Sequence, residues 1–380
     1  MLEQATLNQA AQVLAGLRPG ERADTALRAY FAARRYLRPG ARRALSRAVF
    51  AYFRWLRWLE DRAAPQARIA QAVELQERFD ANPAAIKSQA LVARAVPDWI
   101  REELEVSPEH ARQLQREPAL WLRARPGTGA QLASQLGDCV PSALAPDALR
   151  YTGREDLFRT AAFHQGAFEI QDLASHLVGL ACAPRPGETW WDACAGEGGK
   201  TLHLCDLMGN KGVVWATDRH ERRLAVLRRR AARAQLFNLR AALWDGSARP
   251  PTGTRFDGIL VDAPCSGVGT WQRNPQARWT TSPDDVRELA ATQLALLNQV
   301  AGSLRPGGRL VYAVCTLTRS ETTGVAAAFS AAHPELHPEP VGTPVAAGAA
   351  PTPAANNGLT LWPHELEANG MFIAAWKRDQ

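Results

Sequence analysis

Apolar segments alternate with helical segments from about residue 187 onward, and this alternation limits the possible folds most strongly. The segments typical of strands are TWWDACA (189–195), GVVWATD (212–218), NLRAALWD (238–245), FDGILVDAP (256–264), GRLVYAVC (308–315) and MFIAAWKR (371–378). Helices are expected between them, at 200–209, 221–234, 283–304 and 319–333. Near-continuous apolar strands separated by helices predict a parallel sheet that is covered on both faces. The expected fold class is therefore α/β.

The 380 residues leave room for more than one domain. Residues 5–80 carry apolar side chains at three- and four-residue steps, which is typical of helices. Prolines interrupt residues 83–180, where short strands and helices are expected instead. We therefore expect a helical domain at 1–115, a small α+β subdomain at 116–180 and the α/β domain at 181–380.

The net charge of +7 is concentrated near the N-terminus, where residues 1–80 contain 14 Arg against 8 Asp and Glu. A basic helical surface suits the phosphates of a nucleic acid. An ordinary solvated helix face explains the same pattern equally well. The charge thus makes an RNA-binding role for residues 1–115 plausible without establishing it.

Neither a membrane segment nor a secretory signal is visible in the sequence. The six cysteines are scattered and form no C-x-x-C pair, so neither a metal site nor a thioredoxin-type motif is expected. Scattered cysteines in a chain without a signal are typical of reduced thiols. We therefore expect a cytoplasmic protein with no metal ion and no membrane contact, and a monomer.

The segment DACAGEGGKT (192–201) follows the first strand of the α/β domain and opens a helix. Glycines let the backbone approach a ligand closely, and a helix N-terminus offers unpaired N–H groups. A phosphate-binding P-loop would need Gly where Cys194 stands, and a dinucleotide fingerprint lacks its first Gly. The segment thus predicts a cofactor loop of another kind.

Acidic residues end successive strands at the same expected edge of the sheet. They are Asp192, Asp218, Asp245 and Asp262. Asp218 lies 20 residues after Gly198, the usual distance for a carboxylate that binds a ribose. Single strand-end aspartates are often turn formers, but four of them favour an uncharged or cationic ligand. An adenosyl cofactor with a sulfonium centre fits this chemistry.

Two cysteines are expected at the same edge, Cys265 just past the fourth strand and Cys315 at the end of the fifth. A buried cysteine in apolar surroundings is inert, so location is the argument for reactivity here. A thiolate is an effective nucleophile toward an electron-poor ring carbon. The two thiols are therefore candidates for covalent catalysis.

Together these motifs resemble the Sun/RsmB family of S-adenosylmethionine-dependent RNA cytosine-5 methyltransferases. The resemblance covers about residues 116–380 and rests on DACAGEGGKT, DAPCSG (262–267), RPGGRLVYAVCTL (305–317), NGMFIAAWKR (369–378), GAFEIQDLAS (166–175) and GTWQRNPQARW (269–279). Residues 22–60 look like part of the NusB-like helical RNA-binding domain of that family. The resemblance implies a Rossmann-like, seven-stranded methyltransferase sheet, preceded by a small α+β subdomain and the N-terminal helical domain.

The resemblance also implies a role for each site residue. Cys315 would attack carbon 6 of cytosine, Cys265 would assist release, and Asp262 would hold the cytosine edge beside the cofactor. Asp218 would bind the ribose of S-adenosylmethionine, and Asp245 would lie near the adenine. The loop around the methionine part would consist of Cys194, Ala195, Gly196, Glu197, Gly198, Gly199 and Lys200.

The implied substrate is a structured RNA with an exposed cytosine, since the base must leave its stack to react. Small-subunit ribosomal RNA is the favoured substrate and tRNA the alternative. Trp271, Arg273 and Trp279 are candidates for stacking on the RNA or clamping it, with ordinary loop packing as an equal alternative.

Two residues depart from the family pattern. Gly196-Glu197 stands where the family usually has Ala-Pro, and Val314 stands where it usually has Thr. We expect cofactor binding to survive the first change and the role of Cys315 to survive the second. A non-catalytic RNA-binding or ribosome-assembly protein that retains the fold remains an alternative.

Overall fold

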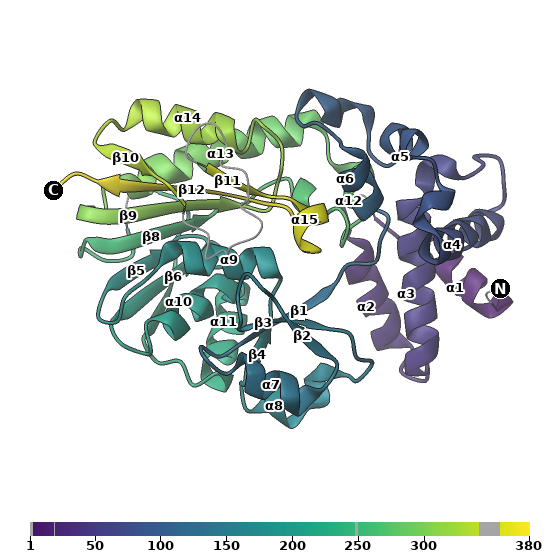
Figure 1. Cartoon of the computed structure of the whole chain (residues 1–380), viewed down its shortest axis with the longest axis horizontal. Coiled ribbons are helices and arrows are strands. Elements are labelled where there is room, and N and C mark those ends of the chain that lie inside the picture. Colours follow the sequence, from purple (N-terminus) through teal and green to yellow (C-terminus); the bar gives the residue numbers. More distant parts are fainter. Residues whose placement is uncertain (1–2, 19, 248–249, 342–357) are drawn as a thin grey trace. The chain divides into compact units, whose positions relative to one another are not determined.

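The computed structural model describes residues 3–18, 20–247, 250–341 and 358–380. The chain divides into two compact units (Figure 1). A helical unit comprises Met1–Pro118 and Gly267–Pro283, and an α/β unit comprises Ala119–Ser266 and Asp284–Gln380. The three-domain division expected from the sequence stays a prediction.

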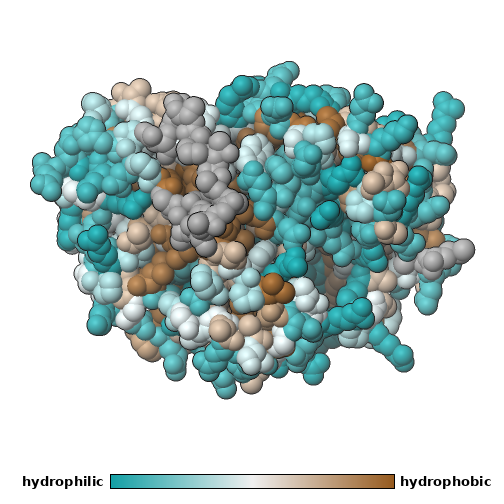
Figure 2. Space-filling view, in the orientation of Figure 1, coloured by the Kyte–Doolittle hydropathy of each residue, from teal (hydrophilic) through white to brown (hydrophobic). Residues whose placement is uncertain are grey.

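Helices of 4 to 17 residues build the helical unit around a core of aliphatic and aromatic side chains. Its helices are α1 (Gln4–Ala15), α2 (Ala23–Ala33), α3 (Pro39–Arg54), α4 (Pro65–Ala81), α5 (Ser88–Arg94), α6 (Pro108–Gln113) and α12 (Ala277–Thr280), with the 3-10 turns η1 (Leu56–Trp58), η2 (Pro83–Ala85), η3 (Asp98–Glu102) and η5 (Val268–Thr270). Pro39 and Pro65 begin α3 and α4, where a missing N–H costs nothing. Figure 2 shows that hydrophilic residues make up most of the face of this unit that is in view.

Residues 267–283 belong to the helical unit because a buried arginine fixes them there. Arg278 is fully buried, and its guanidinium donates to the backbone oxygens of Trp271, Ala95 and Leu114 and to the side chain of Gln115. A buried guanidinium is tolerated only when its N–H groups have acceptors. The partners of Arg278 thus tie the segment after Cys265 to residues from α5 and the end of α6.

The tryptophans of this segment are packing residues within the helical unit. Trp271 is 1% exposed, and its ring meets that of Trp99 edge-on at 6.2 Å. Trp279 is half-buried and donates its Nε1 hydrogen to Phe53 O at 2.7 Å. The predicted stacking of Trp271 on RNA is therefore wrong, because protein encloses its ring. The only hydrogen-bond donor of Trp279 is bonded to the protein backbone.

The α/β unit begins with a small antiparallel sheet. Its strands β1 (Leu120–Ala124), β2 (Cys139–Pro141), β3 (Ala148–Tyr151) and β4 (Phe168–Ile170) lie in the order β2-β3-β1-β4. The short helices α7 (Gly129–Leu136) and α8 (Ala161–His164) and the turn η4 (Leu157–Arg159) connect them. β1 lies within the apolar stretch ALWLRARP (119–126), and β4 leads into α9 (Leu173–Cys182).

The large sheet has the order β10-β12-β9-β8-β5-β6-β7, with β11 also paired to β12. The strands are β5 (Thr189–Asp192), β6 (Val213–Asp218), β7 (Leu239–Leu243), β8 (Phe256–Asp262), β9 (Leu304–Val314), β10 (Leu336–Glu339), β11 (Gly358–Leu361) and β12 (Met371–Arg378). β5 to β9 are parallel, and β12 is antiparallel to β9. β10 and β11 pair with successive halves of β12, so the sheet stays seven strands wide. The Rossmann-like α/β prediction is confirmed.

Alternating side chains of the strands enter two separate cores, one on each face of the sheet. On β5, Trp190 faces the core formed with α9, α10 (Gly199–Leu207) and α11 (Glu221–Arg233). Trp191 faces the opposite core, formed with α13 (Pro283–Ala301) and α14 (Thr323–Ala332). The remaining helix is α15 (Pro363–Leu366). Helices thus cover both faces, as the apolar strands predicted.

One helix begins later than the sequence suggests. A helix is expected from residue 319, but α14 begins at Thr323. The hydroxyls of Thr316 and Thr318 bind the side chain of Glu321 and hold residues 316–321 in a loop. Hydrogen bonds of this kind compete with helix formation.

None of the helices in the described parts of the chain combines the length and the apolar character that a membrane crossing requires.

Replacing Arg278 by Met should destabilise the helical unit. Three backbone oxygens would lose their donor inside the protein, which we expect to cost on the order of 3 kcal/mol. Urea unfolding followed by tryptophan fluorescence measures this as a lower midpoint. Arg287→Met is the control, because Arg287 pairs with Asp284 at the surface, and it should cost about 0.5 kcal/mol or less. Equal midpoints for the two variants would contradict the anchoring role.

Candidate active site

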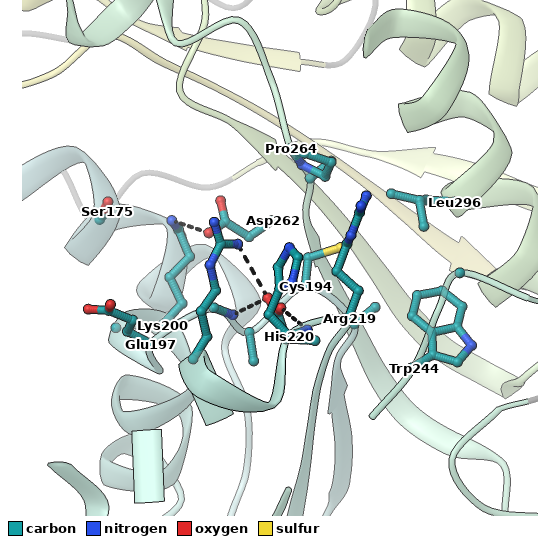
Figure 3. Close-up of a pocket in the computed structure, with 18 of the residues that line it drawn as sticks. Ser175, Cys194, Glu197, Lys200, Arg219, His220, Trp244, Asp262, Pro264 and Leu296 are labelled. Atoms are coloured by element: carbon teal, nitrogen blue, oxygen red, sulfur yellow. Dashed lines mark hydrogen bonds and ion pairs between the residues drawn. The ribbon is translucent and has the colours of Figure 1, made fainter. Parts of the chain in front are cut away.

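A cavity of about 660 Å³ lies at the carboxyl ends of the parallel strands (Figure 3). This is where ligands bind in open α/β sheets, because the loops after the strands diverge there. The cavity is lined by Ile170, Gln171, Asp172, Ser175, Ala193, Cys194, Ala195, Gly196, Glu197, Gly199, Lys200, Asp218, Arg219, His220, Arg223, Arg230, Trp244, Asp245, Gly246, Asp262, Ala263, Pro264, Thr292 and Leu296. The lining thus includes every predicted cofactor-binding residue except Gly198.

Gly198 lies in the turn that leads from the loop into α10 and does not line the cavity. It has φ +87°, and a Cβ there would lie 2.6 Å from Cγ of Leu227. A side chain would therefore have to displace α11 or strain the backbone. Since α10 begins at the next residue, Gly198 lets the loop turn sharply into the helix, and its role is in the turn rather than on the cavity wall.

The unusual Gly196-Glu197 pair is held by a long-range contact. Arg230 of α11 donates to Glu197 O at 2.8 Å and to Glu169 Oε2 at 2.9 Å. Glu169 is 5% exposed and also accepts a hydrogen bond from Arg233. The loop that lacks the rigid proline of the family is thus fixed by an arginine, while the Glu197 side chain is exposed at the rim.

Asp218 binds the loop from the neighbouring strand. Its Oδ2 accepts from the N–H of Gly196 at 3.1 Å, and its Oδ1 accepts from the N–H of His220 at 2.8 Å. Asp245 lies further along the rim and is exposed. Hydrogen bonds from Ser247 lower the pKa of the Asp245 carboxyl, so it is charged at neutral pH.

An ion pair between a buried lysine and a half-buried aspartate lines the cavity. Lys200 Nζ lies 2.7 Å from Asp262 Oδ2 (Figure 3), and the lysine side chain is only 10% exposed. Burial opposes the charge of Lys200, but the charge of Asp262 and its hydrogen bond outweigh burial and raise the pKa of the ammonium. Lys200 therefore stays cationic and holds Asp262 in place.

Asp192, at the end of β5, is fully buried beneath the loop and does not line the cavity. Burial raises the pKa of its carboxyl to about 7, although Thr201 donates a hydrogen bond to it at 2.7 Å. Of the four strand-end aspartates, Asp192 thus supports the loop, while Asp218, Asp245 and Asp262 face the cavity.

The two predicted catalytic thiols lie together. Cys265 Sγ and Cys315 Sγ are 3.3 Å apart, and both residues are partly exposed. The hydrogen bond with Cys265 is the strongest influence that lowers the pKa of Cys315; burial and Asp262 oppose it, and Lys200 adds to it. In contrast, burial raises the pKa of Cys194, Cys182 and Cys205 well above the ordinary value, so these three stay protonated.

Val314 belongs to the sheet core rather than to the cavity. It is fully buried, pairs with Phe372 of β12 and packs with the apolar residues between the sheet and α13. A hydroxyl at this position would need a buried partner. The valine thus fills a position in the apolar core, and Cys315 still follows directly after the last residue of β9.

Comparison with known proteins agrees with these features. The family model described as 16S rRNA methyltransferase RsmB/F matches residues 179–377, more than half of the chain. The chain belongs to the RsmB/F family. The resemblance identified from the sequence motifs is thereby confirmed.

Individual relatives in this family are similar over most of the chain. A probable ribosomal RNA small subunit methyltransferase B from Bacillus subtilis is 35% identical over 65% of this chain and 56% of its own length. A protein of the same description from Synechocystis is 33% identical over 74% of this chain and 66% of its own length. A solved methyltransferase homologue from Pyrococcus horikoshii has 26% identity and a TM-score of 0.63, over 72% of this chain and 91% of its own. The chain spans about three fifths of the length of these two curated relatives.

Sequence motifs missed several residues of the cavity wall. Gln171, Asp172 and Ser175 come from the start of α9, and Trp244 precedes Asp245. GAFEIQDLAS contained the first three as part of the family resemblance, but no spacing rule assigned them to a cavity. Arg230 belongs to an arginine-rich helix whose sequence is typical of a solvated face.

Replacing Arg230 by Gln should weaken binding of S-adenosylmethionine. One charge-assisted hydrogen bond to Glu197 O would be lost and the loop would be less restrained, so we expect the Kd to rise about tenfold. Isothermal titration calorimetry measures this directly. Arg233→Gln is the matched control, because Arg233 also binds Glu169 but its hydrogen bond does not reach the loop. Equal losses of affinity in the two variants would show that Glu169, not the loop contact, matters.

Proposed function

We propose that the chain is an S-adenosylmethionine-dependent RNA methyltransferase that methylates carbon 5 of cytosine in small-subunit ribosomal RNA. The family is that of 16S rRNA methyltransferases, and the relatives from Bacillus subtilis and Synechocystis carry the same substrate in their names. The single observation that carries the proposal is the pair of thiols, 3.3 Å apart, at the ends of β8 and β9.

The residues around the cavity fit the proposed cofactor. Asp218 and Asp245 are suited to hydroxyl and amino groups of the adenosine part, and the loop from Cys194 to Lys200 would surround the methionine part. The carboxylates favour a sulfonium, whereas they would repel a phosphate. When bound, S-adenosylmethionine supplies the methyl group.

The proposed reaction uses the two thiols in different ways. Cys315, whose pKa is lowered, adds as a thiolate to carbon 6 of cytosine, and the displaced electron pair moves to carbon 5. Carbon 5 then takes the methyl group, whose bond to the sulfonium sulfur would break and leave its electron pair on that sulfur. Cys265, after losing its own proton to solvent, takes the proton from carbon 5 as a thiolate, the ring double bond re-forms, and Cys315 leaves as a thiolate.

Asp262 would hold the Watson–Crick edge of the flipped cytosine. Its Oδ2 is bound by Lys200, so Oδ1 is the oxygen proposed to meet the base. Keeping Asp262 in one position lets the ring carbon approach Cys315 in a fixed geometry, which is a large part of what catalysis requires.

Substitution of each thiol should give a different product. Cys315→Ala should abolish methyl transfer, because no covalent bond to carbon 6 can form. Cys265→Ala should instead accumulate a covalent protein–RNA adduct, because release is impaired. Labelled S-adenosylmethionine with RNA from a strain lacking the gene measures the first result, and denaturing gel electrophoresis shows the second.

Three outcomes would count against this proposal. Full activity of Cys315→Ala would show that Cys315 is not the nucleophile. An adduct that forms only in Cys315→Ala would favour Cys265 as the nucleophile, since DNA enzymes of this chemistry carry the nucleophile in the Pro-Cys motif. Absence of S-adenosylmethionine binding in calorimetry would favour the non-catalytic alternative. Mapping of 5-methylcytosine in that strain distinguishes ribosomal RNA from tRNA.

We also propose that the corner between α2 and α3 contacts RNA phosphates. Arg35, Arg38 and Arg43 are exposed there, next to Tyr36, which is 75% exposed. By contrast, Arg28 and Arg47 of the same unit are paired with acidic side chains. The exposed arginines of the corner are therefore the ones suited to counterion release.

Replacing Arg35 and Arg38 together by Gln should weaken RNA binding uniformly across sequences. We expect the slope of log K against log salt to fall by about 2, because each substitution removes one phosphate interaction. Fluorescence anisotropy at several salt concentrations measures it. Arg185→Gln with Arg255→Gln makes the same charge change at exposed positions of the α/β unit. An unchanged slope in the first variant, or an equal change in both, would contradict the proposed surface.

A further inference from the structure

A buried carboxylate outside the predicted site lies directly behind the two thiols. Glu321 is fully buried in the loop between β9 and α14. It accepts hydrogen bonds from the Ser266 N–H at 2.8 Å, from Gln293 at 2.9 Å, from Thr318 at 2.8 Å and from Thr316 at 3.1 Å. The Ser266 hydroxyl is a fifth donor. Five donors on one side chain are the kind of compensation that a buried carboxylate needs.

These donors come from both thiol-bearing loops. Ser266 directly follows Cys265, and Thr316 directly follows Cys315. The hydroxyls of Ser266 and Thr316 also lie 2.9 Å from each other. Glu321 is therefore bonded to the immediate neighbours of both sulfurs, and it joins the ends of β8 and β9 beyond the last backbone pair of the two strands.

A third element supports the same cluster. Gln293 of α13 donates to Pro264 O as well as to Glu321, both at 2.9 Å. Tyr312 Oη of β9 lies 2.8 Å from Gln293 Oε1 and 2.6 Å from Glu321 O. Glu321, Gln293 and Tyr312 are all fully buried, so the cluster has little freedom to relax. It fixes the Pro-Cys segment through side chains that do not line the cavity.

We infer that Glu321 is a positioning residue that keeps Cys265 and Cys315 in contact. This inference rests on the proposed two-thiol reaction but concerns the geometry of the free protein. The effect is geometric rather than electrostatic, because the influences on the pKa of Cys315 are Cys265, burial, Asp262 and Lys200, not Glu321. Without the carboxylate, the five donors would no longer converge, and the two loops would separate.

The test compares Glu321→Ala with Glu321→Gln. Alanine removes every acceptor, whereas the Gln amide oxygen still accepts from Ser266 N–H and Gln293, and the two hydrogens of its NH2 group can be donated to two of the three hydroxyls. We expect kcat for RNA methylation to fall about 100-fold in Glu321→Ala, as for a small misplacement of reacting groups. Glu321→Gln should keep kcat near the original value. The Kd for S-adenosylmethionine should be unchanged in both.

A second readout reports the thiol pair without any methylation. Phenylarsine oxide binds two adjacent thiols with loss of one water, so it should protect Cys265 and Cys315 from alkylation in the original protein and in Glu321→Gln. Protection should be lost in Glu321→Ala. Asp206→Ala is the matched control, because Asp206 is another buried carboxylate of the α/β unit, but its partners are Arg123 and Arg125. It should lower stability and leave the protection intact.

These measurements separate two kinds of failure. Arsenical protection that depends on Glu321 in a protein without methyl transfer would overturn the proposed function and leave the positioning role intact. Full kcat or full protection in Glu321→Ala would overturn the positioning role, as would equal loss of protection in Asp206→Ala. If Glu321→Ala does not fold, Ser266→Ala replaces it, because this change removes one hydroxyl donor beside Cys265. A partial loss of protection would then support the positioning role, and unchanged protection would overturn it.

Discussion

The parallel direction of β5, β6, β8 and β9 is the constraint on which the site depends. Strands that run the same way end at the same edge, so residues as far apart in the chain as Cys194 and Cys315 meet there. The loop after β5, the carboxylates after β6 and β8 and the thiols after β8 and β9 all follow from this arrangement. Helices on both faces keep water away from the strands that carry them.

Buried and half-buried charged side chains then fix the loops that the sheet brings together. Arg230 holds the Gly196-Glu197 turn, Lys200 holds Asp262, and Glu321 joins the two loops that follow β8 and β9. Each of these groups would be costly if it were left alone. Several hydrogen bonds compensate Arg230 and Glu321, and the ion pair with Asp262 compensates Lys200. The chain therefore uses polar contacts, not only apolar packing, where the position of a loop matters.

The sequence predicted the strands and the strand-end residues well because both depend on local patterns. Apolar runs located β5, β6, β8 and β9 to within a few residues, and Asp218 lies at the end of β6 as expected. The ribose-binding role that the spacing from Gly198 indicates for Asp218 stays a prediction. Cys265 and Cys315 were placed at one edge by topology alone.

Residues whose role depends on a distant partner could not be predicted in this way. Glu321 stands in RSETT, which is typical of a helix start, and Arg230 in an arginine run typical of a solvated face. Trp271 and Arg278 lie in a segment whose polar sequence suggests an exposed loop, yet both are buried. The partners that bury them come from remote parts of the chain, and sequence periodicity carries no information about such pairs.

The inserted segment 267–283 has a consequence for how this protein can be divided. The polypeptide passes between the two units three times, after residues 118, 266 and 283, and the region matched by the family model includes the insertion. A fragment that begins at residue 119 would keep Arg278 and Trp271 but discard the carbonyl groups and rings that enclose them. The helical unit is therefore not encoded by one continuous stretch of the gene. Exchange of this unit between relatives would have to include these 17 residues as well as residues 1–118.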